Sequence, residues 1–221
     1  MKLDEAHKKL NKMVGIPFGK LFTPSDLQTI IKNKGKSGQL LEIALDKKLD
    51  SGNLDFEDGE LKTNKCDSSG NPLETIFITQ ISSVIDELLR KKKFEKTHLY
   101  EKISNILYVP VCKIGTPDSW RFLEPIHINL SLPEFSHLLD IWRDDYYSIC
   151  EQLVEHIEHS KDGFIHTSSG KHLQIRSKDS KNARGEYNQI YSQIYKRMVS
   201  NKNHAFYFKT DMIKELRKSL Y

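Results

Sequence analysis

The hydrophobic and polar positions of this chain repeat with two different periods, which predict both helices and strands. Apolar residues recur at helical spacing in residues 3–13 and from Gln39 to Leu49, and the longest such stripe runs from Pro133 to His159. The continuous apolar run from Asn105 to Val111 is typical of a buried central strand. We therefore expect an α/β fold in which helices flank a mixed central sheet.

A second kind of strand is predicted over residues 171–178, where apolar and polar side chains alternate. Its polar face carries Gln174, Arg176 and Lys178. Arg and Gln form paired hydrogen bonds with base edges, and Lys binds phosphate or guanine, so this face suits DNA. An ordinary half-exposed strand is the alternative interpretation.

The candidate chemistry lies in an acidic turn that leads into Glu60-Leu61-Lys62. In a strand, Glu60 and Lys62 share one face while Leu61 points into the core, and the turn brings Asp55 back beside Glu60. Adjacent carboxylates favour a divalent ion such as Mg²⁺, and a nearby ammonium can orient water and stabilise charge on a phosphate. Asp followed by Glu-x-Lys is the signature of restriction-endonuclease-like nucleases. In a chain with 29% charged residues, a solvated hairpin is the alternative.

Charge is distributed unevenly along the chain, although the formal net charge is only +4. From Glu134 to Glu158 there are seven acids and one Lys or Arg, whereas from Lys171 to Lys209 there are nine bases and two acids. A basic surface of this kind suits a polyanion, although a solvated basic face is also common.

Cysteine usage and hydropathy exclude several classes of protein. The three cysteines are widely spaced, which indicates neither a disulfide framework nor a zinc site and suggests a reducing compartment. The first residues lack the apolar run of a signal peptide, and no stretch approaches the length of a membrane span. We expect a soluble, cytoplasmic protein with no membrane association.

Several motifs in one collinear order extend the nuclease hypothesis to almost the whole chain. They resemble the family of the mismatch-repair endonuclease MutH, which also contains type II restriction endonucleases that cut at GATC. The matching segments are Gly35-Lys36-Ser37-Gly38-Gln39-Leu40-Leu41-Glu42, Asp55-Phe56, Gly59-Glu60-Leu61-Lys62-Thr63, Gly70-Asn71-Pro72-Leu73-Glu74-Thr75-Ile76-Phe77, His98 to Val111, Leu173 to Lys178 and Phe206-Tyr207-Phe208-Lys209.

The resemblance implies a metal-dependent DNA endonuclease that binds double-stranded DNA. It assigns Asp55 and Glu60 to Mg²⁺ and Lys62 to catalysis, adds Glu42 as a helix carboxylate, and places Lys102 near the scissile phosphate. It also implies a set of DNA-contacting residues, namely Lys34, Glu74, Phe77, Arg176, Lys178 and Tyr207.

The resemblance further implies a single endonuclease domain over residues 1–221, with a catalytic lobe of about residues 1–111 and a DNA-recognition lobe of about residues 112–221 around a DNA cleft. Two biological settings stay open. A restriction enzyme would cut unmethylated DNA unaided and accompany a cognate DNA methyltransferase, whereas a methyl-directed mismatch-repair enzyme would nick one strand with a MutL-like activator. The chain has the size of a single MutH-like unit, which fits repair. Its divergence and the altered basic loop of residues 32–38, which lacks the tryptophan of MutH, lean towards restriction. The spacer between Asp55 and Glu60 is also about two residues shorter than in MutH. A catalytically inactive DNA-binding module is the third hypothesis.

Overall fold

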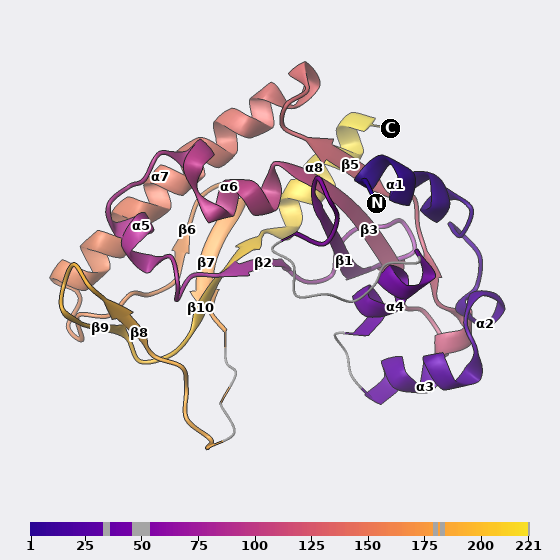
Figure 1. Ribbon diagram of the computed structural model, residues 1–221, viewed down its shortest axis with the longest axis horizontal. Helices are drawn as coiled ribbons and strands as arrows, with labels where there is room; N and C mark the ends of the chain where they lie inside the picture. Colours follow the sequence, from indigo (N-terminus) through magenta and orange to yellow (C-terminus); the bar gives the residue numbers. More distant parts are fainter. Residues whose placement is uncertain (33–35, 46–53, 179–180, 182–183, 221) are drawn as a thin grey trace. The chain divides into compact units, whose positions relative to one another are not determined.

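The computed structural model describes residues 1–32, 36–45, 54–178, 181 and 184–220, and the chain forms two compact units (Figure 1). The first unit comprises residues 1–76, 102–129 and 216–221, and the second comprises residues 77–101 and 130–215. The architecture is mixed α/β, as the sequence predicts, and is compatible with a restriction-endonuclease-like fold. In the described part of the chain, none of the helices could span a lipid bilayer.

The first unit is built on a sheet whose centre is β3 (Asn105–Cys112), the strand expected from its apolar run. Strand β1 (Glu60–Cys66) pairs parallel with β3, in a register that places Glu60 opposite Ile106. Strands β4 (Arg121–Phe122) and β5 (Ile126–Asn129) both pair antiparallel with β3. Because β1 enters the sheet directly from the acidic turn, the sheet fixes the backbone of the predicted motif.

In the described residues that precede this sheet, four helices bury one of its faces. The core they share with the sheet includes Leu61 of β1 and Leu107 and Val109 of β3. Helix α4 lies close to β1, since a Cβ on its Gly38 would be 3.3 Å from Oγ1 of Thr63. The helices are α1 (Leu3–Asn11), α2 (Phe18–Leu21), α3 (Pro24–Lys32) and α4 (Lys36–Ala44).

Two expected boundaries in this region were wrong. The sequence predicted a basic loop up to residue 38 and a helix from residue 39, but α4 already begins at Lys36. The run Leu73-Glu74-Thr75-Ile76-Phe77-Ile78-Thr79 predicts a strand from Leu73, but β2 (Ile76–Gln80) begins only at Ile76. The reason lies in contacts with β1: the Leu73 N–H donates to the Lys65 carbonyl oxygen at 3.0 Å, and the Asn64 side-chain amide donates to the Glu74 carbonyl oxygen at 3.0 Å, so residues 73–75 are held as a loop.

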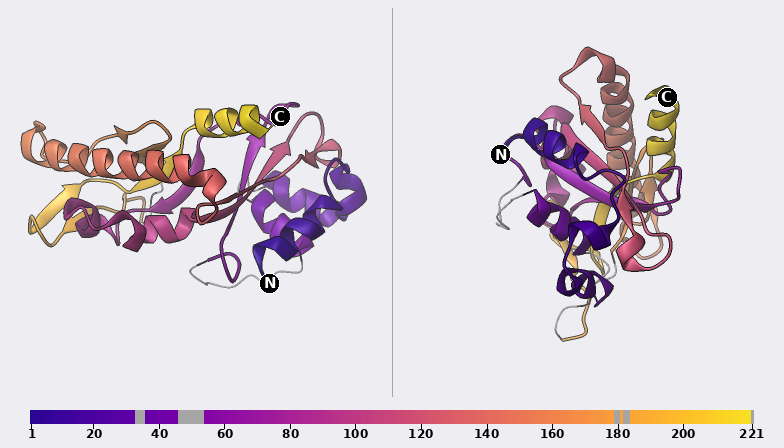
Figure 2. Two further views of the ribbon diagram at one scale, coloured as in Figure 1. Left: turned by 90° about the horizontal axis from the view of Figure 1, so that it is seen from above. Right: turned by 90° about the vertical axis from the view of Figure 1, so that its right-hand side faces the viewer.

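The second unit is organised around the sheet β2-β10-β7-β6, with α7 (Ser136–His159) packed along it (Figures 1 and 2). Strand β7 (Leu173–Ser177) pairs antiparallel with β10 (His204–Phe208) and with β6 (Ser168–Ser169). The ring of Trp142 on α7 lies 4.9 Å from that of Phe208. The apolar faces of the strands therefore turn toward the helix and leave their polar faces on the other side.

Shorter elements complete the second unit. Residues 81–89 look helical in the sequence, but the helix begins only at Ile85, because the Ile81 N–H donates to the His204 carbonyl oxygen and residues 81–84 form a turn. A hairpin in residues 190–200 was not predicted, since its strands are only three and four residues long. The elements are α5 (Ile85–Leu89), α6 (His98–Ile103, which ends in the first unit), β8 (Ile190–Ser192), β9 (Arg197–Ser200) and α8 (Thr210–Leu220, which begins here), with 3-10 turns at Phe94–Lys96 and Pro133–Phe135, and at Pro117–Ser119 in the first unit.

Candidate active site

The first residues of β1 bring an acid and a base together on one face of the sheet. The Lys62 ammonium forms an ion pair with Oε2 of Glu60, and the Glu60 side chain is only 2% exposed. Leu61, between them, lies in the apolar core on the opposite face. The alternation expected from the sequence is confirmed, and the buried Glu60 is not the surface residue of a solvated hairpin.

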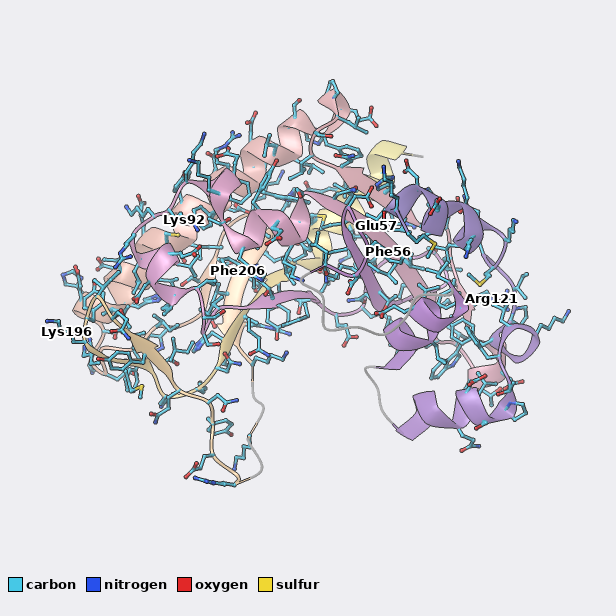
Figure 3. The ribbon with its side chains drawn as sticks, in the orientation of Figure 1. Phe56, Glu57, Lys92, Arg121, Lys196 and Phe206 are labelled. Atoms are coloured by element: carbon cyan, nitrogen blue, oxygen red, sulfur yellow. The ribbon has the colours of Figure 1, made fainter. Side chains whose placement is uncertain are left out.

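Asp55 lies beside Glu60. It directly precedes Phe56 and Glu57, which are labelled in Figure 3. Its Oδ2 accepts a hydrogen bond from the Leu61 N–H at 3.0 Å, and its carboxyl group is hydrogen-bonded to that of Glu60. Burial raises the pKa of Asp55, and the negative charge of Glu60 raises it further, although Lys62 opposes the shift. The two carboxyl groups thus form the expected pair.

Lys102 reaches the same carboxylate from α6. Its ammonium lies 2.6 Å from Oε1 of Glu60, so each oxygen of Glu60 accepts from one lysine. Burial acts to raise the pKa of Glu60, but Lys62 and Lys102 outweigh it and hold the pKa below its ordinary value. Glu60 is therefore ionised near neutral pH. Without the two lysines, a buried negative charge at this position would destabilise the folded protein.

The donor set fits a hard divalent cation. Mg²⁺ is usually held by one or two carboxylates together with water and substrate phosphate, and Asp55 and Glu60 supply such a pair. Within the described ranges, no group of three or more His, Cys, Asp or Glu side chains is arranged to hold a metal. Glu42 lies half-buried on α4, so the structure places it on the helix that packs against β1 but does not join it to the pair as a third ligand.

A separate cluster in the second unit brings together four of the predicted DNA-contacting residues. The Arg176 guanidinium stacks on the Tyr207 ring at 4.3 Å, and the Lys178 ammonium lies 3.9 Å from the centre of the Phe77 ring. Phe77 and Tyr207 are themselves in edge contact at 5.7 Å. Burial lowers the pKa of Lys178. Adjacent strands thus present interleaved cations and aromatic rings on the polar face of the sheet.

The remaining predicted DNA contacts lie elsewhere. Glu74 is exposed in the loop before β2, where it raises the pKa of Lys113 against the larger lowering caused by burial of that lysine. Lys34 falls outside the described residues.

Sequence reasoning did not single out the residues that hold the turn between Asp55 and Glu60. Asp58 accepts hydrogen bonds from Leu3 and Asn105, and Asn105 contacts His127. Asn105 is the first residue of the apolar strand β3, and His127 lies between two isoleucines in β5. A single polar residue in a strand gives no periodic pattern, so only its polarity beside apolar neighbours could have drawn attention to either position.

Comparison with known proteins supports the resemblance seen in the motifs. A family model described as "DNA mismatch repair enzyme MutH" matches residues 47–119, which include Asp55, Glu60, Lys62 and Lys102. A DNA mismatch repair protein MutH from Actinobacillus pleuropneumoniae serotype 5b (strain L20) is 29% identical over 186 residues, which cover 79% of this chain and 76% of the relative.

Two further relatives match a shorter part of the chain. The MutH proteins of Shewanella woodyi and Haemophilus influenzae are 30% and 31% identical over 138 residues, or 54% of this chain. The match spans 57% and 59% of these relatives, which is less than two thirds of their length. The resemblance of this chain to the MutH-like nuclease family, expected from its motifs, is confirmed.

Proposed function

We propose that this MutH-like protein is a metal-dependent endonuclease that hydrolyses phosphodiester bonds in double-stranded DNA at GATC-like sites. The observation that carries the proposal is the cluster of Asp55, Glu60, Lys62 and Lys102, in which a buried carboxylate pair is met by two ammonium groups. A module that only bound DNA would have no need of carboxylates that repel phosphate, which disfavours the inactive alternative.

Asp55 and Glu60 are the residues that would hold Mg²⁺. Each Glu60 oxygen keeps a second lone pair beside its lysine hydrogen bond, so the lysines leave room for coordination. The ion supplies charge neutralisation at the phosphate and lowers the pKa of a bound water. Burial and the charge of Glu60 raise the pKa of Asp55, and a cation bound between the two carboxylates would favour their ionised forms.

The two lysines would have different roles at the scissile phosphate. Lys62, only 13% exposed, is fixed beside the carboxylates, where its ammonium would orient the attacking water and stabilise the growing negative charge. Lys102 reaches Glu60 from a different element, and its ammonium would lie near the phosphate that is cut. In-line attack on phosphorus then breaks the bond to the leaving oxygen.

Recognition is assigned to the cluster on β2, β7 and β10. Arg176 is exposed and its guanidinium plane is held by Tyr207, which orients its donors for a base edge. Lys178, stacked on Phe77, would contact phosphate or guanine. Glu74 and Lys34 complete the proposed contacts.

We place the activity in a type II restriction system with a cognate DNA methyltransferase. The divergence of this chain from the MutH relatives, with identities of 29% to 31%, supports this setting, as does the altered basic segment of residues 32–38, which lacks the tryptophan of MutH. The relatives are nevertheless named as DNA mismatch repair proteins, which supports the second candidate, a methyl-directed strand-nicking enzyme that needs a MutL-like activator.

The test is cleavage of supercoiled plasmid that contains GATC, either unmethylated or adenine-methylated, by the protein alone with Mg²⁺. Linear fragments that map to GATC only in unmethylated DNA are expected for restriction. Slow nicking that a MutL-type protein accelerates would instead assign repair. Tight DNA binding without cutting under either condition would contradict the endonuclease proposal.

A further inference from the structure

The turn between Asp55 and Glu60 determines how the two carboxyl groups face each other. The Phe56 N–H donates to the Gly59 carbonyl oxygen at 2.9 Å, which closes a four-residue turn directly between the two acids. Asp55 is tied forward to the Leu61 N–H at 3.0 Å. Any displacement of the turn therefore changes the separation of the paired carboxylates.

Two groups from outside the turn hold it at Asp58. The Leu3 N–H, in the first turn of α1, donates to Oδ1 of Asp58 at 2.8 Å. The Asn105 side-chain amide donates to the Asp58 carbonyl oxygen at 2.7 Å. Gly59 lies so close to the backbone of Asn105 that a Cβ there would collide with the Asn105 carbonyl oxygen and with Leu3. The turn is thus pressed against the start of β3.

The orientation of the Asn105 amide is set by His127. The Oδ1 of Asn105 lies 2.8 Å from Nε2 of His127, and because an amide oxygen only accepts, Nε2 carries the proton and donates. This contact directs the amide nitrogen of Asn105 to Asp58. His127 lies on β5, which pairs with β3, so the imidazole, the amide and the turn form one chain of hydrogen bonds across neighbouring elements.

We infer that Asn105 is a positioning residue that fixes the Asp55–Glu60 turn in its active geometry, and that His127 holds Asn105 in the orientation this requires. The inference rests on the proposed function. Asn105 touches neither carboxylate, so its effect passes through the carbonyl of Asp58, two residues before Glu60. Small displacements of catalytic groups cost large factors in rate, and an amide that locks the turn prevents them.

The first variant is Asn105→Leu, which keeps the approximate shape of the side chain and loses its hydrogen bonds to Asp58 and His127. It is compared with a pair of variants at the other position, His127→Leu and His127→Gln. Gln places an N–H close to the position of Nε2, whereas Leu cannot donate. We expect Asn105→Leu to lower the Mg²⁺-dependent kcat about tenfold, with KM for DNA within about twofold of the wild type. His127→Leu lowers kcat in the same direction, and His127→Gln restores it.

Amide hydrogen exchange separates this inference from the endonuclease proposal. The Leu61 N–H, bonded to Asp55, reports on the turn directly, and the Leu173 N–H, bonded to Asp145 in the other unit, reports on general opening. We expect exchange at Leu61 to accelerate at least about fivefold in Asn105→Leu and His127→Leu, with Leu173 unchanged and His127→Gln near wild type.

Exchange at Leu61 within about twofold of the wild type in both leucine variants would overturn the positioning role, whatever the activity. A wild-type protein that cuts no DNA would refute the proposed function, while the exchange result would still decide the role of Asn105. Should Asn105→Leu fail to fold, the comparison of His127→Leu with His127→Gln decides it.

Discussion

The ammonium of Lys102 lies 2.6 Å from a carboxylate oxygen of Glu60, 42 positions away in the chain. The second oxygen of Glu60 is paired with Lys62, so a carboxylate with 2% exposure is balanced by two cations from separate elements. This arrangement makes the ionisation of Glu60 dependent on both lysines.

Lys102→Gln removes one of the two cations, so the pKa of Glu60 should rise. We expect the rate of DNA cleavage to fall about 100-fold at neutral pH and the acid limb of the pH–rate profile to move to higher pH. Lys96 is an exposed lysine in the 3-10 turn before α6. Lys96→Gln therefore serves as the control and should leave the pH–rate profile unchanged.

Lys62→Ala should abolish cleavage and leave DNA binding largely intact, because Lys62 is placed at the carboxylates and not among the proposed base contacts. Binding is measured with Ca²⁺ in place of Mg²⁺, and cleavage with Mg²⁺. A Lys62→Ala protein that cuts at the wild-type rate would refute the role assigned to this lysine.

Asp55→Asn should stabilise the fold at neutral pH. The pKa of Asp55 is raised in the folded protein, chiefly by burial and then by Glu60, so its ionisation costs stability as pH increases through the range between its unfolded and folded values. Asn keeps an oxygen for the Leu61 N–H. We expect a gain on the order of 1 kcal/mol, or ~2–4 °C in Tm, at pH 7.

The gain from Asp55→Asn should disappear below the ordinary pKa of an aspartate, where the carboxyl is protonated in both states. Thermal melts of both proteins across this pH range, without metal, measure it. A variant that melts below the wild type at pH 7 would show that ionised Asp55 stabilises the turn.

Asp145→Ala should destabilise the second unit strongly. The buried carboxylate accepts from the N–H groups of Lys171, His172 and Leu173 at 2.6–2.8 Å, and these lead into the strand that carries Arg176. Three donors, two of them buried, would lose their acceptor, at a cost of about 3 kcal/mol or more. Urea denaturation measures the loss, and the exposed neighbour Asp144→Ala is the matched control.

Arg176→Ala should weaken binding to GATC-containing duplex by ~1–3 kcal/mol and reduce the preference for that site over unrelated DNA. Tyr207→Ala removes the ring on which the guanidinium stacks and should lower the same preference, because Arg176 loses its fixed orientation. Fluorescence anisotropy with both duplexes gives the comparison, and Lys161→Ala, an exposed lysine elsewhere in the unit, controls for loss of charge.

The face-sharing of Glu60 and Lys62 and the apolar strand β3 could be predicted from the sequence, because both depend on short, regular periodicity. The start of β2 could not, because tertiary contacts of Leu73 and Asn64 override the local strand propensity. Likewise, no local pattern brings Lys102 to Glu60; only the family resemblance pointed to it. The hydrogen bond from Asn105 to Asp58 had no sequence signature, because it joins residues 47 positions apart.

The path of the chain between its two units has a practical consequence. The backbone passes from one unit to the other four times, after residues 76, 101, 129 and 215. An excised fragment of residues 1–111 would lack β5, and with it His127, while carrying α5 without its partner α7. Neither unit can therefore be produced by cutting the gene once. To transfer DNA specificity between this protein and a related nuclease, individual surface residues would have to be grafted, because a contiguous half of the chain does not correspond to one unit.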